Sequence, residues 1–372
     1  MYKIHCLNNI SSKGTDLLSD AYELTDDLAQ ATGVLVRSAA MHDMEFPRDL
    51  LAIGRAGAGV NNIPLDRCAD EGIVVFNSPG ANANAVKELV LCGMFLACRD
   101  IVGGIAWCKE NADDENIGKS AEKAKKAFAG TEILGKKLGV IGLGAIGRLV
   151  AEAAVALGME VMGYDPYLPE GAPFLNTTDL NEIYANCDFI TVHVPAMEST
   201  IGMIGEQACA QMDGAVVLNF SRDTLVDADA MAAALESGKV RRYVTDFATP
   251  AVMKMSNAIV LPHLGASTAE AEENCAIMAV NELMDYIERG IINKSVNFPA
   301  IDAGELAAGN ARIVVLHTAA AADAVAAAAG AVAAAATRGE RAVTIVDVAA
   351  ADAEAVAAKL AAVEGVARAR VL

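Results

Sequence analysis

The chain has 372 residues, with 29 lysines and arginines against 48 aspartates and glutamates, and its net charge is −19. This excess of negative charge argues against nucleic acid as a partner, because nucleic acids bind to basic surfaces. No apolar run approaches the length of a membrane span, and the first residues do not have the pattern of a signal peptide. We therefore expect a cytoplasmic protein that does not bind a membrane.

The length predicts two or three domains. Eight cysteines and five histidines are scattered along the chain and form no Cys-x-x-Cys pair or other cluster of ligands. We therefore expect free thiols in a reducing compartment, and no metal site.

Residues 1–80 alternate short apolar runs with polar or glycine-rich turns. Strands are predicted at 2–7, 33–37, 51–55 and 73–77, which is typical of a small parallel α/β domain. Ligands of such sheets bind at the carboxyl ends of the strands. Two arginines and a glycine loop at these ends suggest an anion site, although the arginines could also be solvated surface groups. The candidate substrate contacts are Arg37, Ser38, Arg55, Ala56, Gly57, Ala58, Gly59 and Asn77.

A long apolar helix is predicted at 83–100, and a polar, lysine-rich segment follows at 109–137. We interpret this segment as a solvated connector. The alternative is a basic arm, carrying Lys123, Lys125 and Lys126, that reaches a phosphate across a dimer interface.

The most informative stretch runs from Leu138 to Asp165. A strand at 138–141 leads into a Gly-x-Gly-x-x-Gly turn, a helix with one apolar face, and a second strand at 160–164 that ends in Asp165. The glycines permit a tight turn, a close approach to a pyrophosphate and the packing of helix on strand, and the acid can accept both hydroxyls of a ribose. The stretch predicts a dinucleotide site with NAD as cofactor, formed by Gly142, Gly144, Ala145, Ile146, Gly147 and Asp165.

Four more strands are predicted after Asp165, at 189–194, 215–219, 242–246 and 259–261. Pro195, Arg222, Asp246 and His263 lie at or just beyond their carboxyl ends, where the ligand of the domain is expected. We interpret His193 as a structural residue. Ser267 and Glu270 have the spacing of a capping box, which predicts a helix from there to about Arg289.

The last segment, 303–372, is rich in alanine. Strands are predicted at 312–317, 342–348 and 366–372, and a helix at 352–363. Almost every large apolar residue is missing between Ala319 and Ala336, so that stretch can supply little packing energy.

These residues together resemble the D-2-hydroxyacid dehydrogenase family, and most closely its phosphoglycerate branch. The resemblance covers residues 1–300 and rests on Arg55–Asn61, Asn77–Gly80, Leu138–Gly147, Asp165, Asn219–Arg222, Leu261–Thr268 and Val296–Pro299. It implies an α/β architecture, with a flavodoxin-like substrate-binding domain at 1–90, to which the chain returns at 285–300, and a Rossmann-type NAD-binding domain at 91–284. Residues 301–372 resemble an ACT domain, a ferredoxin-like α+β regulatory domain that binds serine in relatives. A homodimer or homotetramer is also implied.

By the same resemblance, Arg222 would clamp the carboxylate of the substrate, His263 would be the acid/base, and Asp246 would face the nicotinamide. The substrate would be a phosphorylated 2-hydroxy acid, oxidised with NAD. The alternatives are a dehydrogenase of glycerate, hydroxypyruvate or glyoxylate, and a non-catalytic protein that senses NADH.

Two features depart from the family pattern. The family usually carries a glutamate that pairs with the histidine, whereas the segment from Phe247 to Pro262 holds no carboxylate. The polar residues expected after the first strand of the ACT domain are Ala319–Ala322 here. We therefore expect no tight inhibition by serine, and we expect turnover to survive removal of residues 301–372.

Overall fold

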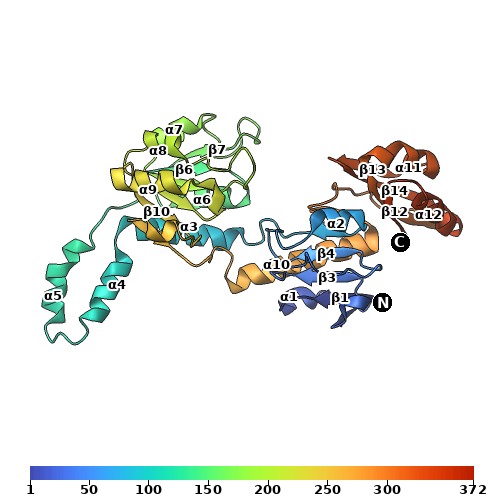
Figure 1. The fold of residues 1–372 in the computed structure, drawn as a ribbon, viewed down its shortest axis with the longest axis horizontal. Coiled ribbons are helices and arrows are strands. Elements are labelled where there is room, and N and C mark those ends of the chain that lie inside the picture. The colour runs from blue at the N-terminus through green and yellow to red at the C-terminus, as the bar shows by residue number, and fades with distance from the viewer. The chain divides into compact units, whose positions relative to one another are not determined.

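The computed structural model describes residues 1–372 and divides them into two compact units. One unit combines Met1–Asn82 with Thr268–Leu372, and the other is Ala83–Ser267. The boundaries expected from the sequence, at 90/91 and 284/285, fall inside the long helices α3 (Ala83–Cys98) and α10 (Ala269–Arg289), both drawn in Figure 1. The division between the two compact units lies at the amino-terminal ends of these helices.

The first unit contains a parallel five-stranded sheet in the order β2-β1-β3-β4-β5, which is the flavodoxin-like order. Its strands are β1 (Tyr2–Cys6), β2 (Tyr22–Thr25), β3 (Gly33–Val36), β4 (Ala52–Arg55) and β5 (Val74–Phe76). Helices α1 (Ser12–Thr15) and α2 (Leu65–Asp70) belong to the same unit. The buried face of α10 contributes Ala279, Leu283 and Tyr286 to the core of this sheet.

Helix α10 begins one residue later than a Ser267 cap would place it. The side chain of Thr268 accepts a hydrogen bond from the backbone N–H of Ala271, at 3.1 Å, and thereby caps the helix. The third residue after Thr268 is an alanine, so the reciprocal bond of a capping box is absent.

The second unit is built on a parallel six-stranded sheet in the order β11-β10-β9-β8-β6-β7. The strands are β6 (Lys137–Ile141), β7 (Glu160–Tyr164), β8 (Phe189–Val192), β9 (Ala215–Asn219), β10 (Val240–Thr245) and β11 (Ala258–Val260). Every residue of β8 and β9 is buried, as expected for parallel strands covered on both faces. The helices are α3, α6 (Ala145–Ala156), α7 (Leu180–Asn186), α8 (Glu206–Gln211) and α9 (Ala228–Ser237). This is a Rossmann-type α/β architecture.

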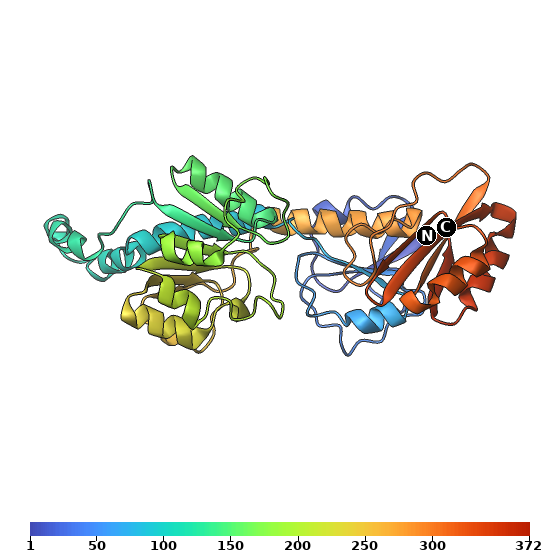
Figure 2. The same ribbon diagram turned by 90° about the horizontal axis from the view of Figure 1, so that it is seen from above.

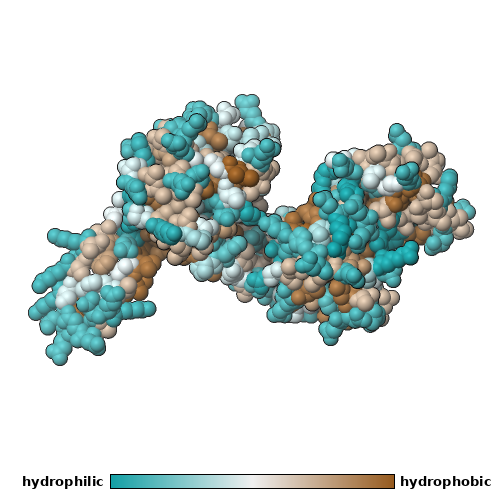
Figure 3. Space-filling model, viewed as in Figure 1, coloured by the Kyte–Doolittle hydropathy of each residue, from teal (hydrophilic) through white to brown (hydrophobic).

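Residues 101–124, which overlap the expected connector, form the helical arm of α4 (Ile101–Glu110) and α5 (Ile117–Ala124) (Figure 1). The ring of Trp107 in α4 lies against the ring of Phe128, which follows α5, with centroids 6.4 Å apart. Ile101, Val102 and Ile105 of α4 are exposed, and Figure 3 shows hydrophobic surface along the arm between hydrophilic side chains. No single helix is long and apolar enough to cross a membrane; α3 and α4 reach that length and composition only as a pair bent by 68°.

The C-terminal residues form an antiparallel sheet in the order β13-β14-β12-β15, with two helices, which is the ferredoxin-like βαββαβ arrangement. The elements are β12 (Asn310–Thr318), α11 (Ala322–Ala329), β13 (Ala334–Arg338), β14 (Arg341–Ala349), α12 (Ala353–Ala361) and β15 (Val366–Val371). Six short 3-10 helices complete the chain: Leu28–Gln30, Lys125–Ala127, Asp223–Leu225, Val252–Lys254, Ala319–Ala321 and Ala350–Asp352.

Both faces of this C-terminal sheet are buried. One face packs under α11 and α12 through Ile313 and Val315. The opposite face contributes Val314, Leu316, Val343 and Ile345 to the same core as Tyr286, Ile287 and Phe298. The C-terminal sheet, red in Figure 2, lies next to the end of the orange helix α10. Although 319–336 does contain few large apolar residues, the C-terminal sheet shares a hydrophobic core with the rest of the first unit.

Candidate functional site

The glycine turn after β6 has the geometry that the sequence predicts. Gly142 has φ +92°, and a Cβ there would lie 2.9 Å from the carbonyl carbon of His193. A Cβ on Gly147 would lie 1.9 Å from the carbonyl oxygen of Gly142, so only glycine lets α6 start this close to the strand. Gly144 caps α6 and borders open space. An anion such as a pyrophosphate can approach the helix N-terminus there, next to Ala145 and Ile146.

Asp165 follows β7 and is fixed by two backbone N–H groups. Its Oδ2 accepts from Leu143 of the glycine turn, at 2.9 Å, and its Oδ1 accepts from Tyr167, at 3.0 Å. The carboxylate is thereby fixed beside the glycine turn. Its spacing in sequence from that turn is the spacing of an acid that binds a ribose.

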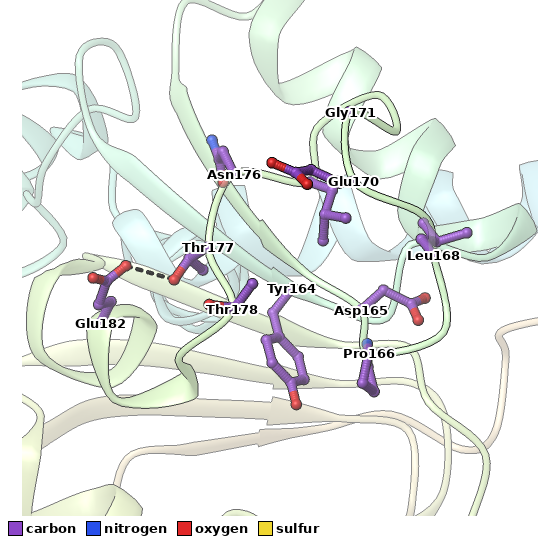
Figure 4. Close-up of a pocket in the computed structure, with 11 residues that line it drawn as sticks. Tyr164, Asp165, Pro166, Leu168, Glu170, Gly171, Asn176, Thr177, Thr178 and Glu182 are labelled. Atoms are coloured by element: carbon purple, nitrogen blue, oxygen red, sulfur yellow. Dashed lines mark hydrogen bonds between the residues drawn. The ribbon is translucent and has the colours of Figure 1, made fainter.

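A cavity of about 580 Å³ opens beside Asp165 (Figure 4). The sequence did not predict its far wall, formed by the loop that carries Glu170, Gly171 and Asn176. Neither lysine nor arginine lines this cavity, whereas Asp165, Glu170 and Glu182 do. Its electrostatics therefore oppose an additional phosphate on the ribose.

Arg222, Asp246 and His263 follow the adjacent strands β9, β10 and β11. Asn219 fixes the turn after β9, because its side-chain N–H donates to the carbonyl of Arg222 at 2.8 Å. Ser221 donates to the carbonyl of Val194, at 2.7 Å, and links this turn to the end of β8, where Pro195 lies. Arg222 itself is exposed.

Asp246 is only 1% exposed and organises the turn that carries His263. Its Oδ2 accepts from the N–H of Gly265, at 2.8 Å, and its carbonyl accepts from the N–H of His263, also at 2.8 Å. Its Oδ1 is buried without a hydrogen-bond partner. A carboxylate oxygen in this state would accept a bond from the carboxamide of a bound nicotinamide, so the residues present fit the cofactor.

His263 has a left-handed backbone with φ +46° and an exposed side chain. Its ring packs edge-on against the ring of Phe247, with centroids 5.2 Å apart. No carboxylate forms an ion pair or hydrogen bond with the ring. Phe247 was not predicted as a site residue, and nothing in its local sequence singles it out.

His193, interpreted from the sequence as a structural residue, follows β8, and its Nδ1 is buried without a hydrogen-bond partner. Its ring lies within 2.9 Å of the Thr191 hydroxyl, and burial lowers its pKa to about 4. Burial thus favours the neutral form of the ring.

The candidate substrate residues lie at the carboxyl ends of β3, β4 and β5 in the other unit. The side chain of Asn8 accepts from the backbone N–H groups of Arg37, Ser38 and Ala39, at 2.9 to 3.1 Å, and fixes the turn after β3. The Arg37 guanidinium forms an ion pair with Glu272, at 2.6 Å. The carboxylate of Glu272 therefore offsets much of the positive charge of Arg37.

The glycine loop after β4 shapes the position of Arg55. Gly57 has φ +139°, and a Cβ there would lie 1.5 Å from Nη1 of Arg55. Asn77 donates to the carbonyl of Ala58, at 2.7 Å, and the Ser78 hydroxyl lies 3.0 Å from the carbonyl of Arg55. The end of β5 thus holds the loop that includes Ala56 and Gly59. Asn8 was not predicted, and Ser78 was noted only as part of the Asn77–Gly80 motif, because each acts on residues remote in sequence.

In residues 1–372, no group of three or more histidine, cysteine or acidic side chains could hold a metal ion. All eight cysteines are free thiols.

Comparison with known proteins shows which family has these features. Residues 92–265 match the model of the "D-isomer specific 2-hydroxyacid dehydrogenase, NAD binding domain". The chain is 34% identical over 316 residues to a hydroxypyruvate reductase of Thermotoga maritima, which covers 78% of this chain and 99% of that protein. It is also 34% identical over 293 residues to the D-3-phosphoglycerate dehydrogenase of Methanocaldococcus jannaschii and 36% over 293 residues to that of Rattus norvegicus, covering 75% of this chain in each case. The chain spans about half the length of these two enzymes, 54% and 53%.

Solved structures share the fold. An NAD+-bound 3-phosphoglycerate dehydrogenase of Entamoeba histolytica has a TM-score of 0.65 at 24% identity, covering 80% of this chain and 98% of that one. A glyoxylate/hydroxypyruvate reductase of Sinorhizobium meliloti has a TM-score of 0.67 at 20% identity, covering 80% and 98%. The second unit is an NAD-binding domain, and the chain belongs to the D-isomer-specific 2-hydroxyacid dehydrogenase family.

Proposed function

We propose that this chain oxidises 3-phosphoglycerate to 3-phosphohydroxypyruvate with NAD, the first step of L-serine biosynthesis. The observation that carries the chemistry is the placement of Arg222, Asp246 and His263 at the ends of three neighbouring strands. An acid/base, a cation for a carboxylate and a buried acceptor for the cofactor are the groups that oxidation of a 2-hydroxy acid requires.

Each residue has a distinct role in this proposal. An imidazole nitrogen of His263 takes the proton of the C2 hydroxyl. The guanidinium of Arg222 holds the substrate carboxylate, since its planar fork matches two oxygens. A bound NAD would supply the acceptor for the hydride of C2. Asp246 keeps the turn of His263 in place through Gly265.

The phosphate specificity rests on Arg55. The glycine loop gives this arginine a position that no other residue at 57 would permit, and the backbone N–H groups of Ala56–Gly59 can also serve an anion. Arg37 is a weaker candidate, because it is already paired with Glu272.

The test compares kcat/KM for 3-phosphoglycerate and D-glycerate, followed as NADH absorbance, and repeats both with Arg55→Ala. We expect kcat/KM for 3-phosphoglycerate to exceed that for D-glycerate by at least about a hundredfold. This ratio corresponds to two factors of ten, each equivalent to about 1.4 kcal/mol. We expect Arg55→Ala to remove most of that preference. Equal use of the two substrates would assign the chain to the second candidate function.

That second candidate is a reductase of hydroxypyruvate or glyoxylate, which the similarity to the Thermotoga maritima enzyme over 99% of its length favours. A non-catalytic NADH-sensing protein is the third. It would bind NADH but show no turnover with any of these substrates.

We also propose that the chain forms a homo-oligomer through the helical arm. The exposed Ile101, Val102 and Ile105 of α4 support this, because an apolar stripe on a projecting helix is stabilised by a partner surface. Sedimentation of the wild type and of Val102→Glu would distinguish an oligomer from a monomer.

A further inference from the structure

A cavity of about 600 Å³ lies where β15 meets the amino-terminal ends of β4 and β5. Leu51 and Ile73, which immediately precede these two strands, form part of its wall, and Arg368 and Arg370 of β15 form another part. The candidate substrate residues follow the carboxyl ends of β4 and β5, at the opposite edge of the same sheet. The cavity is therefore separate from the proposed active site.

Three arginines line this cavity: Arg48, Arg368 and Arg370. None of them forms an ion pair with a carboxylate, although the chain has 48 acidic residues. Arg368 donates to the carbonyls of Arg48 and Glu71, at 3.0 and 3.2 Å. These bonds orient the guanidinium, which forms no ion pair, and only the charge of Asp49, which also lines the cavity, acts on it from a carboxylate.

Arg370 is held in a similar way. Its two terminal nitrogens donate to the carbonyls of Tyr286 and Ile287, at 2.7 and 2.8 Å, and its guanidinium lies over the Tyr286 ring. Its Nε is buried without a partner. The side chain of Arg48 is exposed and forms no hydrogen bond within the protein. N–H donors of these arginines therefore remain available to a ligand. One of these donors, the Nε of Arg370, is buried.

The electrostatics of the cluster also favour an anion. Burial lowers the pKa of Arg368, and the charges of Arg370 and Arg48 lower it further, against the opposing effect of Tyr286 and Asp49. An anion placed beside Arg368 would offset the repulsion that Arg370 and Arg48 exert on its charge.

We propose that this cavity binds a small metabolite that carries a phosphate group. Arginines that reach the site from two separate segments suit a tetrahedral anion, and guanidinium groups bind phosphate oxygens through charge-assisted hydrogen bonds. The volume exceeds that of a phosphate alone and lies in the range of small-molecule sites. Phe46 and Ile73 offer apolar surface for the rest of the ligand, and the carboxylate of Asp49 could accept a bond from its hydroxyl or amino group.

The ligand would join two parts of the first unit. Arg48 belongs to the segment between β3 and β4, whereas Arg368 and Arg370 belong to the C-terminal domain. A phosphate bound to all three would strengthen the docking of that domain, and its binding would stabilise the folded protein in proportion to its concentration.

The test is calorimetric titration of the full chain with inorganic phosphate, in the presence of saturating NADH. Arg48→Ala is the informative variant, because the side chain is exposed and the backbone carbonyl that accepts from Arg368 is retained. Arg99→Ala is the matched control, since Arg99 is also exposed and its side chain forms no hydrogen bond or ion pair.

We expect Arg48→Ala to weaken phosphate binding at least tenfold, Arg48→Glu to abolish the same binding event, and Arg99→Ala to bind like the wild type. Binding to the active site would be unaffected by all three variants, so it cannot produce this pattern. Wild-type affinity in Arg48→Ala and Arg48→Glu, with far-UV circular dichroism showing both folded, would overturn the proposal. So would the absence of any phosphate binding by the wild type.

Discussion

The ring of Phe247 packs edge-on against the ring of His263, with centroids 5.2 Å apart and planes inclined by 63°. In the family pattern, a glutamate partners the histidine, and no carboxylate takes that place here. The ring of His263 is therefore oriented by an aromatic neighbour, while its backbone is held by the carbonyl of Asp246.

Replacing Phe247 tests whether this contact positions the acid/base. Aromatic pairs contribute about 0.5–1.5 kcal/mol beyond the area that they bury, so we expect Phe247→Ala to lower kcat by about threefold to tenfold with little change in the KM for NAD. Phe247→Tyr keeps the ring and should retain most of the activity. Steady-state kinetics of both variants decide the question, and an unchanged kcat in Phe247→Ala would show that the ring plays no positioning role.

Asp165 should make the chain prefer NAD to NADP. The carboxylate would repel a 2′-phosphate, and no lysine or arginine lines the cavity beside it. We expect kcat/KM to favour NAD by about a hundredfold or more, because two charges about 4 Å apart near a surface interact by about 4 kcal/mol. Asp165→Asn keeps the shape and should reduce this preference, and Glu170→Gln would show whether the second carboxylate contributes. A preference for NAD over NADP that survives both substitutions would contradict the role assigned to Asp165.

Gly57→Ala should disturb the substrate site and leave the cofactor site intact. The added Cβ would lie 1.5 Å from Nη1 of Arg55, and the residue would have to keep φ at +139°. We expect the KM for 3-phosphoglycerate to rise by at least about tenfold, equivalent to about 1.4 kcal/mol, while NADH affinity measured by fluorescence stays unchanged. Gly118→Ala is the control, because a Cβ there meets no atom within 4 Å. A similar KM in both variants would show that Arg55 does not contact the substrate.

Removal of the C-terminal domain should destabilise the protein, and the expectation that turnover survives this removal stays a separate prediction. Without residues 301–372, Tyr286, Ile287 and Phe298 would lose the apolar face that covers them. Leu316→Ala, a milder change at a fully buried position of that face, should cost about 2–5 kcal/mol. Arg341→Ala breaks only a surface ion pair with Asp70 and should cost less than about 1 kcal/mol. Urea unfolding measures both, and equal stabilities would contradict the packing argument.

Much of the fold can be predicted from local sequence. The strands at 160–164 and 215–219 were placed to the residue, because each is a nearly continuous apolar run bounded by turn residues. β2 was missed, since only one of its four residues is buried. β13 was missed because three of its five residues are alanines, whose sequence carries no alternating pattern.

The residues of the candidate site also differ in how far local sequence predicts them. Gly142, Gly147 and Asp165 act on neighbours close in the chain, so their spacing alone indicates what they do. Ser78 and Phe247 act through tertiary contacts: the Ser78 hydroxyl lies 2.9 Å from the carbonyl of Cys275, which is 197 residues away. No local pattern encodes such a pairing.

Glu282 provides a test of how a buried carboxyl affects stability. It lies on the buried face of α10, its Oε2 has no hydrogen-bond partner, and Lys294 approaches its Oε1 only to 3.8 Å. Burial raises the pKa of Glu282, and the charge of Lys294 lowers it only in part. The folded protein therefore holds this proton more tightly than the unfolded chain does, so the group favours folding at low pH and loses that contribution as pH rises through the raised pKa.

Glu282→Gln should consequently raise the free energy of unfolding at pH 7 by about 1 kcal/mol, the lower end of the cost of an unsatisfied buried polar group. The gain should vanish below about pH 4. At that pH the glutamate is protonated in the unfolded chain as well, because its unperturbed pKa is about 4.3. Urea unfolding between pH 4 and pH 8 measures this, with Glu152→Gln, an exposed residue of α6, as the control that should show no such trend. A gain of the same size at every pH would mean that the packing of the amide, rather than the charge of Glu282, decides stability at this position.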